Sequence, residues 1–112
     1  MVMKEYIPNR GDIIWINFNP QKGREQSGRR PAYVLSPKIY NQKVGLIIVC
    51  PITSQVKKYP FEVKINIQKI SGAILTDQIR CLDWRTRKIV FIQKGTSRIT
   101  KQIQNKLQVL IG

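Results

Sequence analysis

The sequence predicts a mainly β protein of the α+β kind: a small twisted β-barrel of about six to seven strands with one C-terminal helix. Three observations predict it. Short runs rich in β-branched and aromatic residues recur along the first four fifths of the chain, separated by turn signals. The last segment changes to a helical period. A chain of 112 residues, 42% of them hydrophobic, suits one packed core, so residues 1–112 are expected to form a single domain.

Each expected strand has a local signal. Residues 13–18 follow a Gly-Asp turn, and residues 32–35 follow a long loop, 19–31, which holds two Pro, two Gly and no aliphatic side chain. After an irregular link at 36–41, the segment 44–52 is apolar on both faces, which indicates a central strand. Beyond a basic turn at 53–59, further strands are expected at 61–67, at 73–82 as one long or bent strand, and at 88–92.

The C-terminal segment has the spacing of an amphipathic helix. Ile103, Leu107, Leu110 and Ile111 fall at positions i, i+4, i+7 and i+8, which share one helical face. Thr100 or Ser97 is the expected N-cap, and the helix ends at Gly112. This helix is expected to close or plug the barrel.

The charge points to an anionic partner. Lysine and arginine number 20 against 6 aspartate and glutamate, a net charge of +14. Like charges destabilise a compact state, so such an excess favours a partner such as a nucleic acid, an anionic membrane surface or an acidic protein. No convincing basic amphipathic helix is present, so membrane binding is not expected. A solvated basic face without a partner stays open as the alternative.

The composition excludes several kinds of chemistry. The chain has no histidine, so it has no imidazole base and no histidine-ligated metal. No two of the six carboxylates lie within four positions of each other, so we expect no metal and no cofactor. No apolar run approaches the roughly 20 residues of a membrane span, and no secretory signal is expected. Cys50 and Cys81 are expected as buried or half-buried thiols in a reducing cytoplasm.

A set of polar residues suits one reaction in particular. The long loop carries Glu25, Arg29 and Arg30, and a strand end carries Thr53 and Ser54. RNA contains its own nucleophile, the 2′-hydroxyl beside the scissile phosphate, so a protein needs only to assist proton transfer and stabilise charge on phosphorus. By spacing alone, the loop could equally be a solvated surface, and Thr53 a hydrogen-bonding residue at a strand end.

Several segments resemble the MazF/PemK family of toxin endoribonucleases. They are residues 11–18 (GDIIWINF), 23–36 (GREQSGRRPAYVLS), 51–54 (PITS), 59–63 (YPFEV), 77–80 (DQIR) and 109–112 (VLIG). The resemblance implies an SH3-like barrel, a homodimer, and metal-independent, sequence-specific cleavage of single-stranded RNA such as mRNA, which leaves a 2′,3′-cyclic phosphate and a 5′-hydroxyl. It also implies the toxin half of a type II toxin–antitoxin pair, with an acidic MazE-like antitoxin as partner.

The resemblance also assigns roles to particular residues. Arg30 and Thr53 match the catalytic arginine and threonine of the family, and Glu25 falls where some members place an acid–base carboxylate. Arginine stays charged at neutral pH, so Arg30 is expected as an oxyanion clamp. The residues expected at the RNA are Phe18, Ser54, Asp77, Gln78 and Arg80.

Alternatives remain at the level of residues and of function. Phe18 could be a barrel-packing aromatic, and Arg80 could be a plain phosphate contact. Arg29 stands where a relative may carry histidine, and Arg85 and Arg87 could belong to a basic surface or to a dimer interface. The alternative functions are a CcdB-like toxin that binds gyrase and a passive binder of single-stranded RNA.

Overall fold

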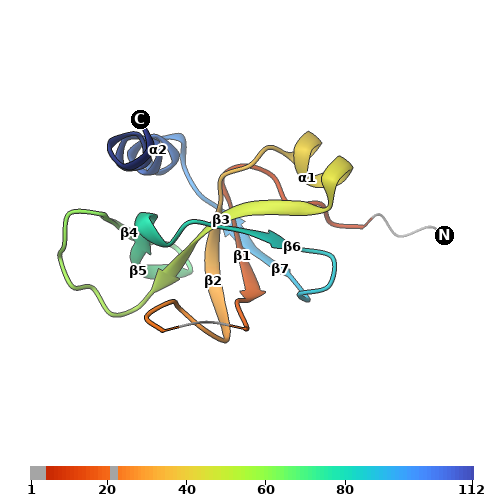
Figure 1. The fold of residues 1–112 in the computed structure, drawn as a ribbon, viewed down its shortest axis with the longest axis horizontal. Helices are drawn as coiled ribbons and strands as arrows, with labels where there is room; N and C mark the ends of the chain where they lie inside the picture. The colour runs from red at the N-terminus through yellow and green to blue at the C-terminus, as the bar shows by residue number, and fades with distance from the viewer. Residues whose placement is uncertain (1–4, 21–22) are drawn as a thin grey trace.

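The computed structural model describes residues 5–20 and 23–112, in which seven strands form one curled antiparallel sheet, a half-barrel (Figure 1). The strand order is β4-β5-β3-β2-β1-β7, and β6 pairs with β3 beside this path. The elements are β1 (Asp12–Asn17), β2 (Arg29–Val34), α1 (Lys38–Val44), β3 (Leu46–Thr53), β4 (Glu62–Ile67), β5 (Ile70–Leu75), the 3₁₀ turn η1 (Thr76–Gln78), β6 (Arg80–Asp83), β7 (Val90–Lys94) and α2 (Ser97–Ile111). The expected mainly β fold with a C-terminal helix is confirmed.

Strand β3 is the centre of the sheet, as its apolar sequence predicts. One edge of β3 pairs with β2, from Val34 opposite Val49 to Ala32 opposite Pro51. The other edge pairs first with β6 and then with β5. Its last residue, Thr53, therefore lies where three strands meet.

The expected strand over residues 73–82 is divided in two by η1. Thr76 turns the chain because its N–H and its hydroxyl both donate to the carbonyl of Phe61, at 3.2 and 2.6 Å. The break lets β5 pair with the end of β3 and β6 with its beginning, so the sheet curls around β3. The prediction of one continuous strand was wrong, although a bend was foreseen.

A second difference is helix α1, which begins within the expected irregular link at 36–41 and runs on to Val44, the residue expected to start the next strand. Asn41 is fully buried and its side-chain amide donates to the carbonyls of Pro8 and Ser36, at 2.8 and 3.0 Å. Gly45 ends the helix in a left-handed conformation, with φ +79°. The helix is thus held by polar contacts of Asn41, and its sequence lacks the apolar periodicity by which a helix is normally predicted.

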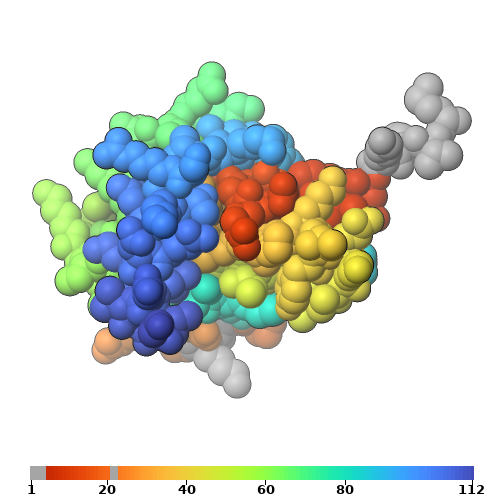
Figure 2. Space-filling model, turned by 90° about the horizontal axis from the view of Figure 1, so that it is seen from above, coloured from red at the N-terminus to blue at the C-terminus, as the bar shows by residue number. Residues whose placement is uncertain are grey.

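Helix α2 packs its inner face on one apolar cluster of the sheet, and both helices lie above the strands in the view of Figure 1 and face the viewer in Figure 2. Its buried residues are Ile99, Ile103 and Leu107, whereas Leu110 and Ile111 are exposed, so the predicted face was one turn too far along the chain. The N-cap is Thr96, whose hydroxyl accepts from the N–H of Ile99, and not Ser97 or Thr100. None of the helices described in the chain is long and apolar enough to cross a membrane.

The two faces of the curled sheet carry separate apolar clusters. Along β1, Ile13 joins one cluster together with Tyr33 and the buried face of α2, while Ile14 and Ile16 join the other. Cys50 is buried as expected, but Cys81 is exposed, because it lies on the outer face of β6. The sheet is therefore packed on both sides, and its loops at the free ends of β1, β2 and β3 are left to form the site.

Candidate active site

Arg30 and Thr53 come together at the ends of two neighbouring strands. The β2–β3 ladder ends with Ala32 opposite Pro51, and continuing by two residues on each strand leads to Arg30 and Thr53. Both residues line one cavity of about 440 Å³, together with Ser54, Trp15 and the loop residues beside Arg30. The structure thus places a guanidinium and two hydroxyl groups at one opening.

The guanidinium of Arg30 is held by the backbone of its own loop. Its Nε donates to the carbonyl of Ser27 at 2.7 Å, and the residue is half-buried. A hydrogen bond through Nε fixes the plane of the group and directs the two terminal nitrogens away from the loop backbone. A guanidinium oriented in this way can clamp a phosphate with two parallel hydrogen bonds.

The hydroxyl of Thr53 is oriented by its own backbone neighbourhood. The side chain is 7% exposed, and Oγ1 accepts from the N–H of Gln55 at 3.1 Å. A hydroxyl has one proton to donate and two lone pairs. Because a lone pair is engaged by Gln55, the proton of Thr53 is available for an oxygen in the cavity.

Thr53 also lines a second cavity of about 490 Å³, which holds Glu25, Asp77 and Gln78. Glu25 therefore does not line the cavity of Arg30, but the two cavities share Thr53 as their common wall. Of the eight residues predicted for the site, six line one or the other cavity, and the exceptions are Phe18 and Arg80.

Asp77 and Gln78 hold the walls of this second cavity together. The hydroxyl of Tyr59 donates to the carboxylate of Asp77, which ties the loop 54–61 to η1. Burial and this hydrogen bond raise the pKa of the Tyr59 phenol above its usual range. The side chain of Gln78 accepts from the N–H of Gln26 at 3.0 Å, which ties the loop after β1 to the same turn.

Phe18 and Arg80 form a separate contact beneath the loop. The Phe18 side chain is fully buried in the core, so its ring is not available to stack on a base, and the alternative of a packing aromatic describes it. Arg80 donates from Nη1 to the Phe18 carbonyl at 3.0 Å, and its guanidinium lies 5.6 Å from the centre of the Phe18 ring. Arg80 is thereby fixed beside Phe18, where the loop that follows β1 begins.

Sequence reasoning missed several residues that line the cavities. In the second cavity these are Arg24, Gln26, Gln55, Lys57, Tyr59, Glu62 and Leu75. In the first, Trp15 is 37% exposed between the fully buried Ile14 and Ile16, an outward position that the alternation along β1 could have revealed. Lys57 and Tyr59 lie in a turn whose sequence shows only that it is basic. No group of three metal-binding side chains occurs among residues 5–20 and 23–112.

The fold and the site define a class of small basic β proteins in which loops at one end of a curled sheet gather cations, a hydroxyl and carboxylates around two joined cavities. A family model described as PemK-like, MazF-like toxin of type II toxin–antitoxin system matches residues 9–111. The chain belongs to this family. The resemblance seen in the sequence is therefore confirmed.

Individual relatives cover nearly the whole chain. The endoribonuclease toxin MazF of Escherichia coli K12 is 44% identical over 99% of this chain and 100% of its own length. The endoribonuclease toxin ChpB of the same organism is 32% identical over 91% of this chain and 92% of its own length.

Solved structures agree with the fold. MazF from Deinococcus radiodurans matches with a TM-score of 0.93 and 44% identity, covering 96% of this chain and 99% of that chain. A MazE–MazF complex from the same organism matches with a TM-score of 0.86 and 44% identity, covering 96% of this chain and 98% of that chain.

Proposed function

We propose that this toxin is a metal-independent, sequence-specific endoribonuclease that cuts single-stranded RNA, mRNA above all, and so inhibits translation and growth. The observation that carries the proposal is that Arg30, Thr53 and Ser54 line one cavity, which shares Thr53 with the cavity of Glu25. The names of the relatives, which are endoribonuclease toxins, support the same activity.

The proposed chemistry uses the RNA as its own nucleophile. The 2′-oxygen forms a bond to phosphorus while the bond from phosphorus to the 5′-oxygen breaks, which yields a 2′,3′-cyclic phosphate and a 5′-hydroxyl. The 2′-hydroxyl loses a proton and the leaving oxygen gains one, so no oxidant, water or metal enters the balance. A carboxylate such as Glu25 serves proton transfer, and such assistance contributes roughly 10²–10⁴-fold.

Arg30 and Thr53 act on the charge that develops at phosphorus. A guanidinium stays protonated throughout, so Arg30 clamps two non-bridging oxygens, and the Thr53 hydroxyl donates to one of them. Ser54, Asp77, Gln78 and Arg80 are proposed as RNA-binding residues. Three of these four already have an oriented side chain.

The test is cleavage of single-stranded RNA in EDTA, followed by analysis of the product ends. We expect cutting with cyclic phosphate termini, and Arg30→Ala should abolish it without loss of fold. The matched control is Arg98→Ala, which removes the same charge from a residue that lines neither cavity. Uncut RNA, cutting that requires Mg²⁺, or full activity of Arg30→Ala would contradict the proposal.

The assembly is also part of the proposal. Residues 1–112 act as one domain, two copies form a homodimer, and an acidic MazE-like antitoxin binds the dimer in the cytoplasm, where mRNA is found. The net charge of +14 and the likeness to the MazF chain of MazE–MazF complexes support the antitoxin. Sedimentation of the pure protein should give about twice 13.0 kDa, whereas a mass of one chain would contradict the dimer.

A further inference from the structure

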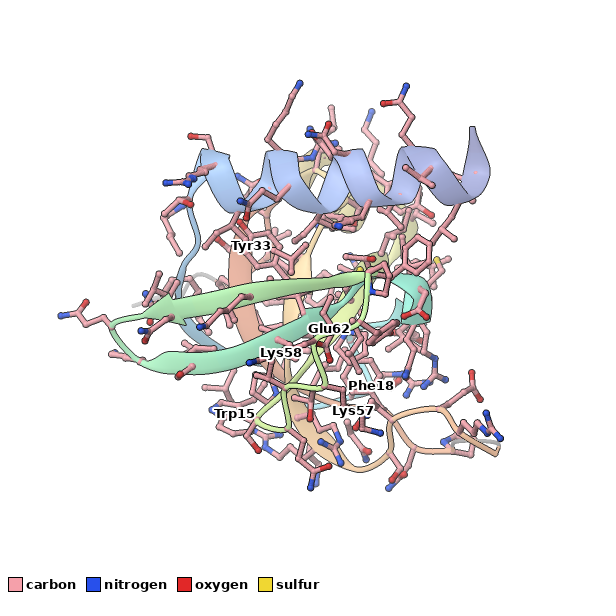
Figure 3. All side chains as sticks on the ribbon, turned by 90° about the vertical axis from the view of Figure 1, so that its left-hand side faces the viewer. Trp15, Phe18, Tyr33, Lys57, Lys58 and Glu62 are labelled. Carbon is pink, nitrogen blue, oxygen red and sulfur yellow. The ribbon has the colours of Figure 1, made fainter. Side chains whose placement is uncertain are left out.

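Glu62 closes the loop 54–61 by accepting backbone hydrogen bonds. Its two carboxylate oxygens lie 3.2 and 3.1 Å from the N–H nitrogen of Lys57, and Oε1 lies 2.8 Å from that of Lys58. In the other direction, the N–H of Glu62 donates to the carbonyl of Tyr59 at 3.1 Å. Figure 3 shows Glu62 beside Lys57 and Lys58 at this end of the sheet.

The carboxylate is thus committed to the protein backbone. Glu62 is half-buried and lines the cavity of Glu25 and Asp77, where a free negative charge would repel a phosphate. Hydrogen bonds from N–H groups to a charged carboxylate are among the stronger ones in proteins. They hold a strained backbone here, since Lys58 has a left-handed φ of +61°.

The loop presents its two lysines differently. Lys57 lines the cavity, as do Gln55 and Tyr59 on either side of it, whereas Lys58 does not line it. Tyr59 supplies a second tie, through its hydrogen bond to Asp77. Glu62 therefore fixes the backbone at Lys57 and Lys58, and Asp77 fixes the side chain of Tyr59.

We propose that Glu62 is a positioning residue for RNA binding, which holds the loop so that the Lys57 ammonium contacts the RNA backbone in the cavity bordered by Thr53. The inference rests on the proposed function and deepens it. It assigns Lys57 as a phosphate contact and gives Glu62, an acidic residue in a nucleic-acid site, a role that favours an anionic ligand.

The first experiment compares Lys57→Gln with Lys58→Gln, which remove the same charge from adjacent positions of one loop. Binding of a single-stranded RNA with 2′-deoxyribose at the cleavage site is measured at several salt concentrations. We expect Lys57→Gln to weaken binding and to reduce the salt slope by about 0.7, the value for one phosphate contact on a single strand. Lys58→Gln should keep the slope of the unmodified protein. Equal slopes for the two variants would overturn the assignment of Lys57.

The second experiment removes the carboxylate. If Glu62 acted only through its charge, Glu62→Gln and Glu62→Ala would bind RNA more tightly. Positioning predicts the opposite: Glu62→Ala weakens binding as much as Lys57→Gln, raises KM and leaves kcat within about twofold. Glu62→Gln, which keeps an acceptor oxygen, should fall between Glu62→Ala and the unmodified protein. Tighter or unchanged binding by both variants would overturn the proposal.

The double variant separates positioning from a direct contact. In a Lys57→Gln background, Glu62→Ala should have no further effect on RNA affinity, because the group that it positions is gone. Additive losses would contradict the proposal. If Glu62→Ala does not fold, the cycle is run with Glu62→Gln. The affinity measurements use uncleavable RNA, so they test the positioning role independently of cleavage, and only the comparison of KM with kcat needs a cleavable substrate. Uncut RNA with the unmodified protein would contradict the proposed function instead.

Discussion

Thr53 shows how one hydroxyl obtains its direction from the backbone around it. The N–H of Gln55 occupies a lone pair of Oγ1, and the side chain is almost fully buried, so its proton remains available to an oxygen in the cavities that Thr53 borders. Thr53→Val keeps the shape and removes the hydroxyl. We expect RNA cleavage to fall by about 10²–10³-fold, the usual loss when one donor to a developing oxyanion is removed.

The measurement is single-turnover cleavage of a short RNA with saturating protein. Thr86→Val is the control, since Thr86 lies on an exposed turn and lines neither cavity. If Thr53→Val folds and cuts RNA at the normal rate, the Thr53 hydroxyl has no role in the cleavage reaction. An equal loss in the control would mean that the effect is general.

The two cysteines should differ sharply in reactivity. Cys50 is buried, and burial raises the pKa of its thiol to about 12, whereas Cys81 is exposed. A thiol reagent such as dithionitrobenzoate should therefore label one group quickly in the folded protein and two after denaturation. Cys81→Ser should lose the fast labelling. Fast labelling of Cys81→Ser would contradict the burial of Cys50.

The raised pKa of Cys50 also predicts a pH dependence of stability. In the unfolded chain this thiol ionises near pH 8.5, whereas in the folded protein it stays protonated to about pH 12. The contribution of the buried thiol to the free energy of unfolding is therefore complete below about pH 8.5. Above that pH it declines, by at most about 1.4 kcal/mol per pH unit. The free energy of unfolding is measured with urea from pH 7 to 10.5 for the natural protein and for Cys50→Ala. The difference between the two values should become smaller above pH 8.5. A constant difference would contradict the shift.

At the residue scale, sequence reasoning identified most of the candidate site because the loop and strand ends carry conspicuous polar groups. It could not tell that Phe18 is buried, since an aromatic at the end of a strand fits a core and an RNA surface equally well. It also missed Lys57 and Glu62, whose importance comes from side-chain-to-backbone hydrogen bonds that no spacing reveals.

At the scale of elements, β5 supports the site through a close approach to β3. A Cβ built on Gly72 would lie 2.1 Å from the carbonyl oxygen of Thr53, and Gly72 has a φ of +153°. Gly72→Ala must therefore push the backbone of Thr53 aside. We expect lower stability, by about 1–3 kcal/mol, together with a loss of cleavage beyond what unfolding explains.

Gly95→Ala is a matched control for this prediction. A Cβ there would lie 2.4 Å from the ring of Tyr33, a comparable overlap on the α2 side of the molecule that does not touch Thr53. Cleavage is compared at a temperature at which both variants are folded. Equal activity of the two variants would show that β5 does not support Thr53 in this way.

Element boundaries were predictable where hydrophobic patterning sets them. A Gly-Asp turn followed by β-branched and aromatic residues located β1, and alternation located β4. The doubly apolar segment identified β3 as central, because each face of that strand meets its own cluster. Helix α1 and the turn η1 were not predictable in this way. Buried polar contacts of Asn41 and Thr76 define them, and those partners lie far away in the sequence.

At the scale of the whole molecule, the charge of +14 exceeds what the site itself uses. Four cations line the two cavities, namely Arg24, Arg29, Arg30 and Lys57. The other basic residues lie elsewhere on the surface, where salt screens them at distances beyond about 8–10 Å. Most of the charge therefore speeds the encounter with RNA chiefly at low salt, while a small set of cations makes the contacts.

This division predicts a modest salt dependence for RNA binding. The four cavity cations together with Arg80, at about 0.7 each, correspond to a slope of log Kd against log salt near 3.5, whereas neutralising the whole net charge would give about 10. The slope is measured by titrating uncleavable single-stranded RNA from 50 to 400 mM KCl. DNA of the same sequence should bind with a similar slope and remain uncut, because it lacks the 2′-hydroxyl. A slope near 10 would mean that RNA wraps the whole basic surface and that the two cavities are only a part of the binding site.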